Sequence, residues 1–177
     1  FFELFLSIKQ TLIFFFASSS WAVNLSSSVS PTAADILGNP NYPAFSYGGY
    51  RDKTRDVVPS VADIKDDMKI LSALGIKIIR TYNTSQYAQA ERLLTAIREL
   101  KDNDPNFEMY VMLGAWIECH RAWTDQANHH KENKKNNHQE IDKAIELANH
   151  YPDIVKVIAV GNEAMVQWAA QYFVYPK

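Results

Sequence analysis

The sequence of 177 residues contains a single cysteine, Cys119, which excludes an internal disulfide and a zinc site built from several cysteines. It also lacks an excess of either charge, since the formal net charge is -2 and the pI is about 6.2. Proteins whose main partner is nucleic acid typically carry a basic surface, so this class is disfavoured. With 47% hydrophobic and 21% charged residues, the composition is that of a globular domain.

A long hydrophobic run is missing at the N-terminus. The apolar run Leu12–Ala17 is much shorter than the roughly 18 residues that a membrane-spanning helix needs. Lys9 precedes this run and small residues ending at Ala22 follow it, which predicts a secretory signal peptide over residues 1–22; the alternatives are an uncleaved anchor, or neither of these. We therefore expect a secreted, periplasmic or cell-wall associated protein with no stable membrane partner.

Nucleotide-binding and serine hydrolase motifs are absent as well. The glycines within Ser46–Tyr50 lack the dinucleotide-binding spacing, and neither a P-loop nor a Gly-x-Ser-x-Gly motif occurs. The sequence predicts no cofactor. Residues 23–43 are rich in Ser, Pro, Asn and Thr and predict a linker or an extended arm, so we expect the folded domain to cover residues 44–177.

What the sequence does contain, from Ala44 onward, is an alternation of strand and helix patterns. Short apolar runs rich in β-branched residues predict strands, and the last of them is so continuously apolar that we expect it to be buried on both faces. Apolar residues at helical spacing predict helices, the first with Ser60 as its N-cap and Gly75 as its stop. The predicted strands are 45–48, 76–82, 107–115 and 154–160, and the predicted helices are 61–74, 90–100, 141–148 and 165–173.

This alternation predicts an α/β fold with a parallel sheet, either doubly wound or part of a (β/α)8 TIM barrel. A whole barrel typically has about 250 residues, so residues 44–177 would form a barrel truncated to about the first four strand-helix units. The third unit carries an insertion between Trp116 and Asn137, either a wall of a substrate cleft or a surface elaboration. Its polar tract, 129–138, fits a solvated loop better than a metal site, and we predict no metal.

Polar and aromatic residues follow the predicted strands, at the edge where parallel α/β folds place their active sites. Glu163, directly after Asn162, could protonate a glycosidic oxygen while the amide binds a sugar hydroxyl; a capping or ion-pairing role is the alternative. Arg80 and Tyr82 could orient a nearby carboxylate. The alternatives are a buried ion pair for Arg80 and a packing role at the barrel rim for Tyr82. The residues expected to converge are Tyr47, Tyr50, Arg80, Tyr82, Asn83, Trp116, Glu118, Asn162 and Glu163.

Three motifs, Phe45–Tyr50, Ile78–Asn83 and Val157–Ala164, resemble successive strand motifs of glycoside hydrolase family 17. That family comprises β-1,3-glucanases and related glucan transglycosylases on a (β/α)8 barrel of clan A. The resemblance implies a retaining mechanism in which Glu163 is the acid/base and Asn162 binds the 2-hydroxyl. It implies substrate or nucleophile contacts for Tyr47, Arg80 and Tyr82, and we add the aromatic Trp116 as a substrate-binding residue.

The family's nucleophile is a second glutamate on strand seven, and no residue of this chain matches it. Glu118 and Asp52 could replace it geometrically, although both fit ordinary loop residues better. We therefore expect an incomplete enzyme, a β-glucan glycoside hydrolase that is inactive as this chain and acts on a polysaccharide or oligosaccharide. The alternatives are a glucan transglycosylase, a noncatalytic carbohydrate-binding or assembly protein, another clan A glycosidase, or an unrelated α/β enzyme; oligomeric state is left open.

Overall fold

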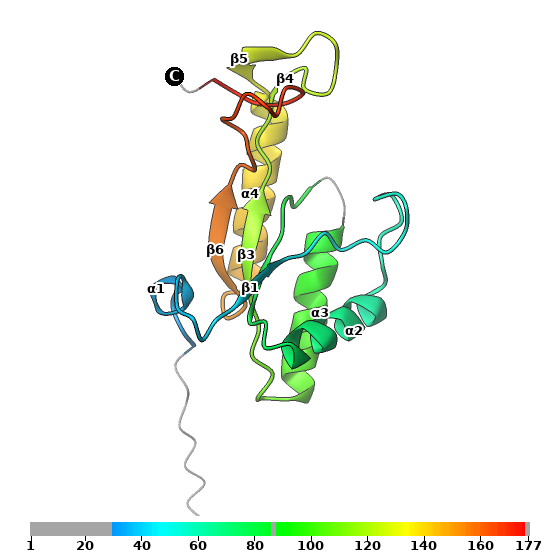
Figure 1. Ribbon diagram of the computed structural model, residues 1–177, viewed down its shortest axis with the longest axis vertical. Coiled ribbons are helices and arrows are strands. Elements are labelled where there is room, and N and C mark those ends of the chain that lie inside the picture. Colours follow the sequence, from blue (N-terminus) through cyan, green and yellow to red (C-terminus); the bar gives the residue numbers. More distant parts are fainter. Residues whose placement is uncertain (1–29, 86–87, 176–177) are drawn as a thin grey trace, which may run out of the picture.

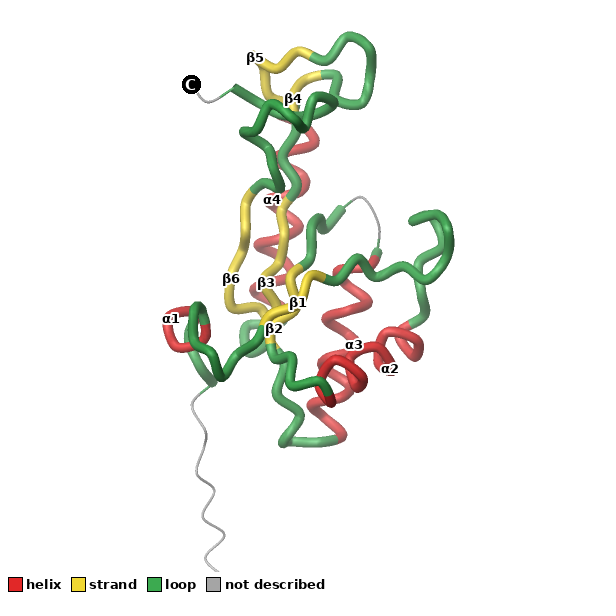
Figure 2. Tube along the Cα trace, in the orientation of Figure 1, coloured by secondary structure: helices red, strands yellow, loops and turns green. Residues whose placement is uncertain are grey.

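The computed structural model describes residues 30–85 and 88–175, and it contains a four-stranded parallel sheet (Figures 1 and 2). The spatial order of the strands is β1-β2-β3-β6. The predicted parallel α/β arrangement is confirmed, while closure into a barrel stays a prediction. The strands are β1 (Ala44–Ser46), β2 (Ile78–Arg80), β3 (Tyr110–Ala115) and β6 (Val155–Val160), and the crossover helices are α2 (Val61–Ala73), α3 (Gln89–Asn103) and α4 (Lys134–His150).

Helix α2 begins and ends where its sequence predicts. The Ser60 hydroxyl accepts a hydrogen bond from the Asp63 N–H at 3.1 Å, and the Asp63 carboxylate accepts one from the Ser60 N–H at 3.0 Å, which completes a capping box. Ile64 and Met68 are fully buried on one face. Gly75 has φ +83°, a left-handed conformation that glycine adopts without a steric penalty, and it ends the helix.

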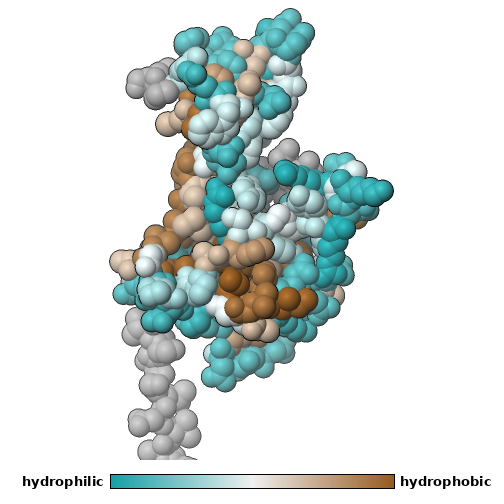
Figure 3. All heavy atoms as spheres, viewed as in Figure 1, coloured by the Kyte–Doolittle hydropathy of each residue, from teal (hydrophilic) through white to brown (hydrophobic). Residues whose placement is uncertain are grey.

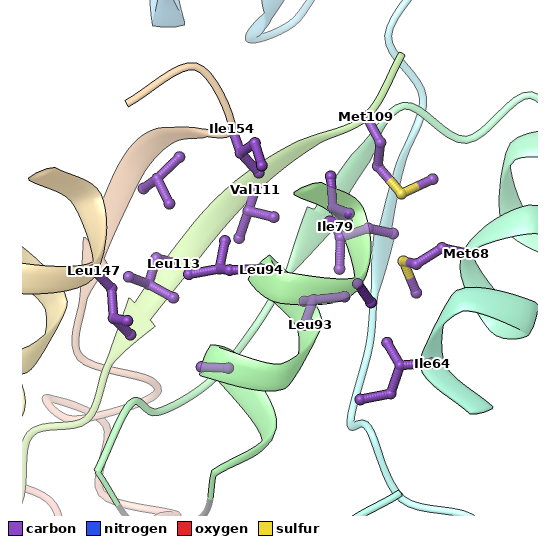
Figure 4. Packing of buried hydrophobic residues seen from close by; sticks show 14 of the residues in the cluster. Ile64, Met68, Ile79, Leu93, Leu94, Met109, Val111, Leu113, Leu147 and Ile154 are labelled. Carbon is purple, nitrogen blue, oxygen red and sulfur yellow. The ribbon is translucent and has the colours of Figure 1, made fainter. Parts of the chain in front are cut away.

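The main core lies between one face of the sheet and the three crossover helices (Figure 4). Ile79, Val111 and Leu113 point to this face and are buried, because side chains two residues apart along a strand share a face. They pack against Leu93 and Leu94 of α3 and against residues of α2 and α4. This burial, worth roughly 25 cal/mol for each Å² of apolar surface removed from water, holds the carboxyl ends of the strands in register.

The other face of the sheet is covered at its lower end by the segment before β1. Helix α1 (Ala33–Ile36) lies near the lower end of the sheet in Figure 1. Its residue Ile36 is 1% exposed and packs with Ile78 and Tyr110. Part of the segment 23–43, expected to be a linker or an extended arm, therefore contributes a short helix and a buried apolar side chain. Residues 1–22, the predicted leader, lie outside the described residues.

The predicted insertion between Trp116 and Asn137 forms a hairpin of β4 (Cys119–His120) and β5 (Asn128–Glu132). The tract 129–138 is mostly exposed, as expected, but it is not a loop, because it supplies most of β5 and the first turn of α4. The predicted helix 165–173 is also absent from the described structure. This segment forms turns, in which the Ala169 carbonyl accepts hydrogen bonds from the N–H groups of Tyr172 and Phe173 at 3.0 Å each. Its end pairs with the hairpin, where the carbonyls of Gln171 and Tyr172 accept hydrogen bonds from the N–H groups of Trp123 and Cys119 at 2.9 Å each.

The strand β6 is less buried than its sequence predicts. Its middle residues are half-buried and Val160 is 62% exposed, because β6 lies at an edge of the described sheet and has a neighbouring strand on one side only. Hydrophobic surface gathers along this side of the molecule, whereas the hairpin end is mostly hydrophilic (Figure 3). None of the helices in residues 30–85 and 88–175 is long and apolar enough to cross a membrane.

Candidate active site

A cavity of about 940 Å³ lies at the carboxyl ends of the parallel strands. This is the edge of a parallel sheet where ligands bind in α/β folds. Loops that follow all four strands contribute to its lining, so the structure brings together most of the residues expected to converge. Those lining the cavity are Tyr47, Tyr50, Tyr82, Asn83, Trp116 and Asn162.

Arg80 lies beside the cavity and orients Asn162. Its guanidinium donates a hydrogen bond to Asn162 Oδ1 at 2.8 Å, and its centre lies 4.7 Å from the centroid of the Tyr82 ring. The expected partner of Arg80 was a carboxylate, but in the described part of the chain the structure pairs it with this amide. Because Oδ1 accepts from Arg80, the two N–H groups of the Asn162 amide remain as donors, and the Asn162 side chain also interacts with the Tyr172 side chain.

Glu163 follows in the turn after β6, and its carboxylate is exposed. Gly161 and Glu163 both have left-handed backbones, with φ of +82° and +53°. For a residue with a side chain this conformation costs about 1–2 kcal/mol, and such strain concentrates at functional sites. The Tyr172 hydroxyl lies 3.4 Å from Glu163 Oε2, a long contact that leaves the carboxylate accessible.

Tyr172 joins Glu163 to the cavity, whose wall it helps to form. Burial raises the pKa of its hydroxyl, and the nearby Glu163 carboxylate raises this pKa further. The tyrosine therefore stays protonated over the neutral range and keeps its O–H as a donor.

The hydroxyl of Tyr47 is already engaged elsewhere. It donates to Asp67 Oδ2 of α2 at 2.6 Å, and burial, followed by this hydrogen bond, raises its pKa well above the ordinary value. The ring packs against the main core and lines the cavity. Tyr47 can therefore offer an aromatic edge to a ligand, while its hydroxyl ties the loop after β1 to α2.

The two carboxylates considered as replacements for a missing nucleophile occupy different places. Asp52 is exposed in the loop after β1, where it accepts a hydrogen bond from the Lys53 N–H at 2.7 Å. Glu118 is 8% exposed and borders a second cavity of about 470 Å³. Its oxygens accept hydrogen bonds from Asn133 at 2.7 Å, Asn136 at 2.9 Å and the Trp123 indole N–H at 3.1 Å. A carboxylate with this set of donors fits a structural role.

Sequence reasoning missed three residues at this site. Trp123 and Tyr172 line the cavity but come from the hairpin loop and from the segment after β6, where no strand-end pattern marks them. Glu140 of α4 is 5% exposed, and its carboxylate accepts hydrogen bonds from the N–H groups of Thr84, Ser85 and Trp116. It thereby joins the loops that follow β2 and β3. The one hint in the sequence was the enlarged third loop.

Within the described residues, no group of three or more His, Cys, Asp or Glu side chains could hold a metal ion. No model of a known protein family matches the chain, and no curated protein matches it. A solved structure does: the crystal structure of an endo-laminarinase from Formosa Hel1_33_131 is 63% identical with a TM-score of 0.78. The match covers 81% of this chain and 36% of that enzyme, so the chain spans about a third of the length of a protein to which it is similar in both sequence and fold.

Proposed function

We propose that the chain is part of a glycoside hydrolase that cleaves β-1,3-linked glucan, as expected for family 17. One observation carries the proposal: Asn162 and Glu163 follow β6 beside an aromatic cavity, in a chain 63% identical to an endo-laminarinase. Aromatic rings and amide groups suit a neutral polysaccharide or oligosaccharide better than a charged ligand. We propose no cofactor and no metal.

In this proposal Glu163 protonates the leaving oxygen and later activates water, which is the acid/base role of a retaining glycosidase. The Asn162 amide nitrogen binds the sugar 2-hydroxyl, an interaction that strengthens in the oxocarbenium-like transition state. The Arg80 hydrogen bond supports this role, because it occupies the amide oxygen and leaves the amide nitrogen to act as a donor.

Retaining cleavage also needs a nucleophilic carboxylate about 5–5.5 Å from the acid/base. We propose that it comes from a later strand of a longer protein, as the family resemblance implies, and that residues 1–177 alone are inactive. The apolar, half-buried edge of β6 supports pairing with a further strand and closure into a (β/α)8 barrel. A polymeric substrate also favours export, which N-terminal sequencing of protein from the culture medium would test.

The role of Glu163 can be tested in the full-length protein by measuring the release of reducing sugar from laminarin. We expect Glu163→Gln to lower kcat by about 100-fold, the scale on which a general acid acts, with an unchanged circular dichroism spectrum. Glu132→Gln, which makes the same change at an exposed position of β5, should retain full activity. Near-normal kcat for Glu163→Gln would remove this residue from the reaction.

Product analysis then separates two reactions within the same proposal. Chromatography of digests should show oligosaccharides shorter than the substrate. Products longer than an added laminarioligosaccharide would instead assign the protein as a transglycosylase. A parent protein that binds laminarin but releases no products would favour a noncatalytic carbohydrate-binding role.

A further inference from the structure

Trp123 is a large aromatic residue held outward at the boundary of the two cavities. It lies in the hairpin loop between β4 and β5, lines both cavities, and is 56% exposed. Its backbone is left-handed, with φ +67°, which is unusual for a bulky residue and costs about 1–3 kcal/mol. Exposure and strain at the same residue are two unfavourable features that other contacts must offset.

Several contacts hold the Trp123 indole in this place. Its Nε1–H donates to Glu118 Oε2 at 3.1 Å, and its ring stacks on Tyr172 with centroids 5.0 Å apart and planes 26° apart. Its backbone N–H donates to the Gln171 carbonyl at 2.9 Å. The indole is therefore fixed in orientation before any ligand arrives.

The carboxylate that anchors the indole is itself fixed. Glu118 is buried, and its second oxygen accepts hydrogen bonds from the side-chain amides of Asn133 and Asn136. The backbone of Glu118 exchanges two more with Asn137: its N–H donates to Oδ1 at 3.0 Å, and its carbonyl accepts from Nδ2 at 3.1 Å. Because three donors and the Asn137 contacts fix Glu118, its function toward Trp123 is to position the ring.

The position of Trp123 relative to Glu163 is set by Tyr172. The Tyr172 ring stacks on Trp123, and the Tyr172 hydroxyl lies 3.4 Å from Glu163 Oε2. Trp116 extends the aromatic surface, with its ring centroid 4.7 Å from that of Tyr172. The aromatic surface of Trp116, Trp123 and Tyr172 therefore adjoins the carboxylate proposed as acid/base.

We propose that Trp123 is a specificity-determining platform on which a glucosyl residue of the β-glucan chain stacks, beyond the two sugars that flank the cleaved bond, because Tyr172 connects Trp123 to Glu163. This inference rests on the proposed function and deepens it. The exposed indole face suits the apolar C–H face of a neutral pyranose ring. Pre-organisation by Glu118 and Tyr172 reduces the entropy that binding would otherwise lose. The platform contributes binding common to substrate and transition state, so its loss raises KM more than it lowers kcat.

The test uses the full-length protein, laminarin and laminarioligosaccharides of increasing length. Trp123→Ala should raise KM at least tenfold for chains long enough to reach the platform, lower kcat less than threefold, and leave KM for the shortest cleaved oligosaccharide unchanged. Trp168→Ala is the matched control, because Trp168 is 76% exposed and lies outside the linings of both cavities. This control should match the parent at every length.

Trp123→Phe guards against a folding defect, since it keeps an aromatic ring on Tyr172 but loses the indole N–H. It should recover most of the affinity lost in Trp123→Ala. Equal KM values for parent and Trp123→Ala at all lengths would overturn the platform, as would an equal loss in Trp168→Ala.

The two proposals fail in different ways. A parent that binds laminarin without cleaving it contradicts the hydrolase, and the Kd ratio of Trp123→Ala to parent then tests the platform: at least tenfold supports it and unity overturns it. A parent that neither binds nor cleaves laminarin overturns both.

Discussion

Three glutamates lie around the carboxyl end of the sheet, and two of them differ from the third in exposure and in hydrogen bonding. Glu118 and Glu140 are 8% and 5% exposed, and each accepts three hydrogen bonds. Glu163 is exposed, sits on a left-handed backbone, and has one long contact, from Tyr172. The buried pair is saturated with donors, whereas the carboxylate of Glu163 is left accessible.

This contrast assigns a structural role to Glu118 and Glu140 and is consistent with the chemical role proposed for Glu163. A buried carboxylate is tolerated only when donors replace the water that it loses, and those donors then depend on it. Glu140 fixes the loops after β2 and β3, and Glu118 fixes Trp123. An exposed carboxylate in strained backbone contributes little to folding and remains free for proton transfer. Removal of the Glu118 or Glu140 side chain should therefore lower stability most, whereas removal of the Glu163 carboxylate should lower the reaction rate most and stability least.

The largest loss of stability is expected for Glu140→Ala. It leaves the N–H groups of Thr84, Ser85 and Trp116 without their acceptor, and we expect the free energy of unfolding to fall by about 3 kcal/mol. Urea unfolding of the full-length protein measures this change. Glu146→Ala is the control on the same helix, because its side chain is exposed and should change stability by less than about 0.5 kcal/mol.

An effect of Glu140→Ala no larger than that of Glu146→Ala would show that water replaces the carboxylate at no cost. The conclusion that buried carboxylates stabilise the site would then be contradicted at Glu140, where the largest effect is expected. Glu140→Gln keeps one acceptor oxygen and should lie between the two.

The second prediction concerns Glu118→Ala, with a smaller expected loss of about 2 kcal/mol, because two of its three donors, Asn133 and Asn136, are close enough to solvent to bind water. The indole of Trp123 also loses its acceptor. Its fluorescence anisotropy should therefore fall, which a Trp123→Phe background would confirm as arising from this residue. Unchanged anisotropy would mean that stacking on Tyr172 alone positions the ring.

The sequence predicted those parts of the fold that local patterns determine. The capping box at Ser60 and the stripe of Ile64 and Met68 specify α2, and the apolar runs specify the parallel strands. The same patterns failed at residues 165–173, where apolar spacing resembles a helix but the segment forms turns whose end pairs with the hairpin. Such pairing between distant segments leaves no periodic trace in either one.

The residues of the candidate site also fall into two groups, those that the sequence could predict and those that it could not. Residues directly after strands, such as Tyr82, Trp116 and Asn162, could be placed from the sequence because parallel strands end at one edge. Trp123 and Glu140 could not, since one depends on how a hairpin folds back and the other is a polar residue on a helix face whose partners are backbone N–H groups. Residues whose hydrogen-bond partners lie on other segments can be recognised only from the tertiary structure.

The smallest effect on stability is expected where the effect on chemistry is greatest. Glu163→Gln should change the free energy of unfolding by less than about 0.5 kcal/mol, because the side chain is exposed and its one contact is long. Glu163→Gly should raise stability slightly, since glycine adopts φ +53° without strain, while Glu163→Val should lower it, because a β-branched residue tolerates that conformation poorly. Urea unfolding of the three variants measures this order. A loss of 2 kcal/mol or more in Glu163→Gln would place Glu163 with the structural carboxylates, and the reason for assigning it the proton transfer would be gone.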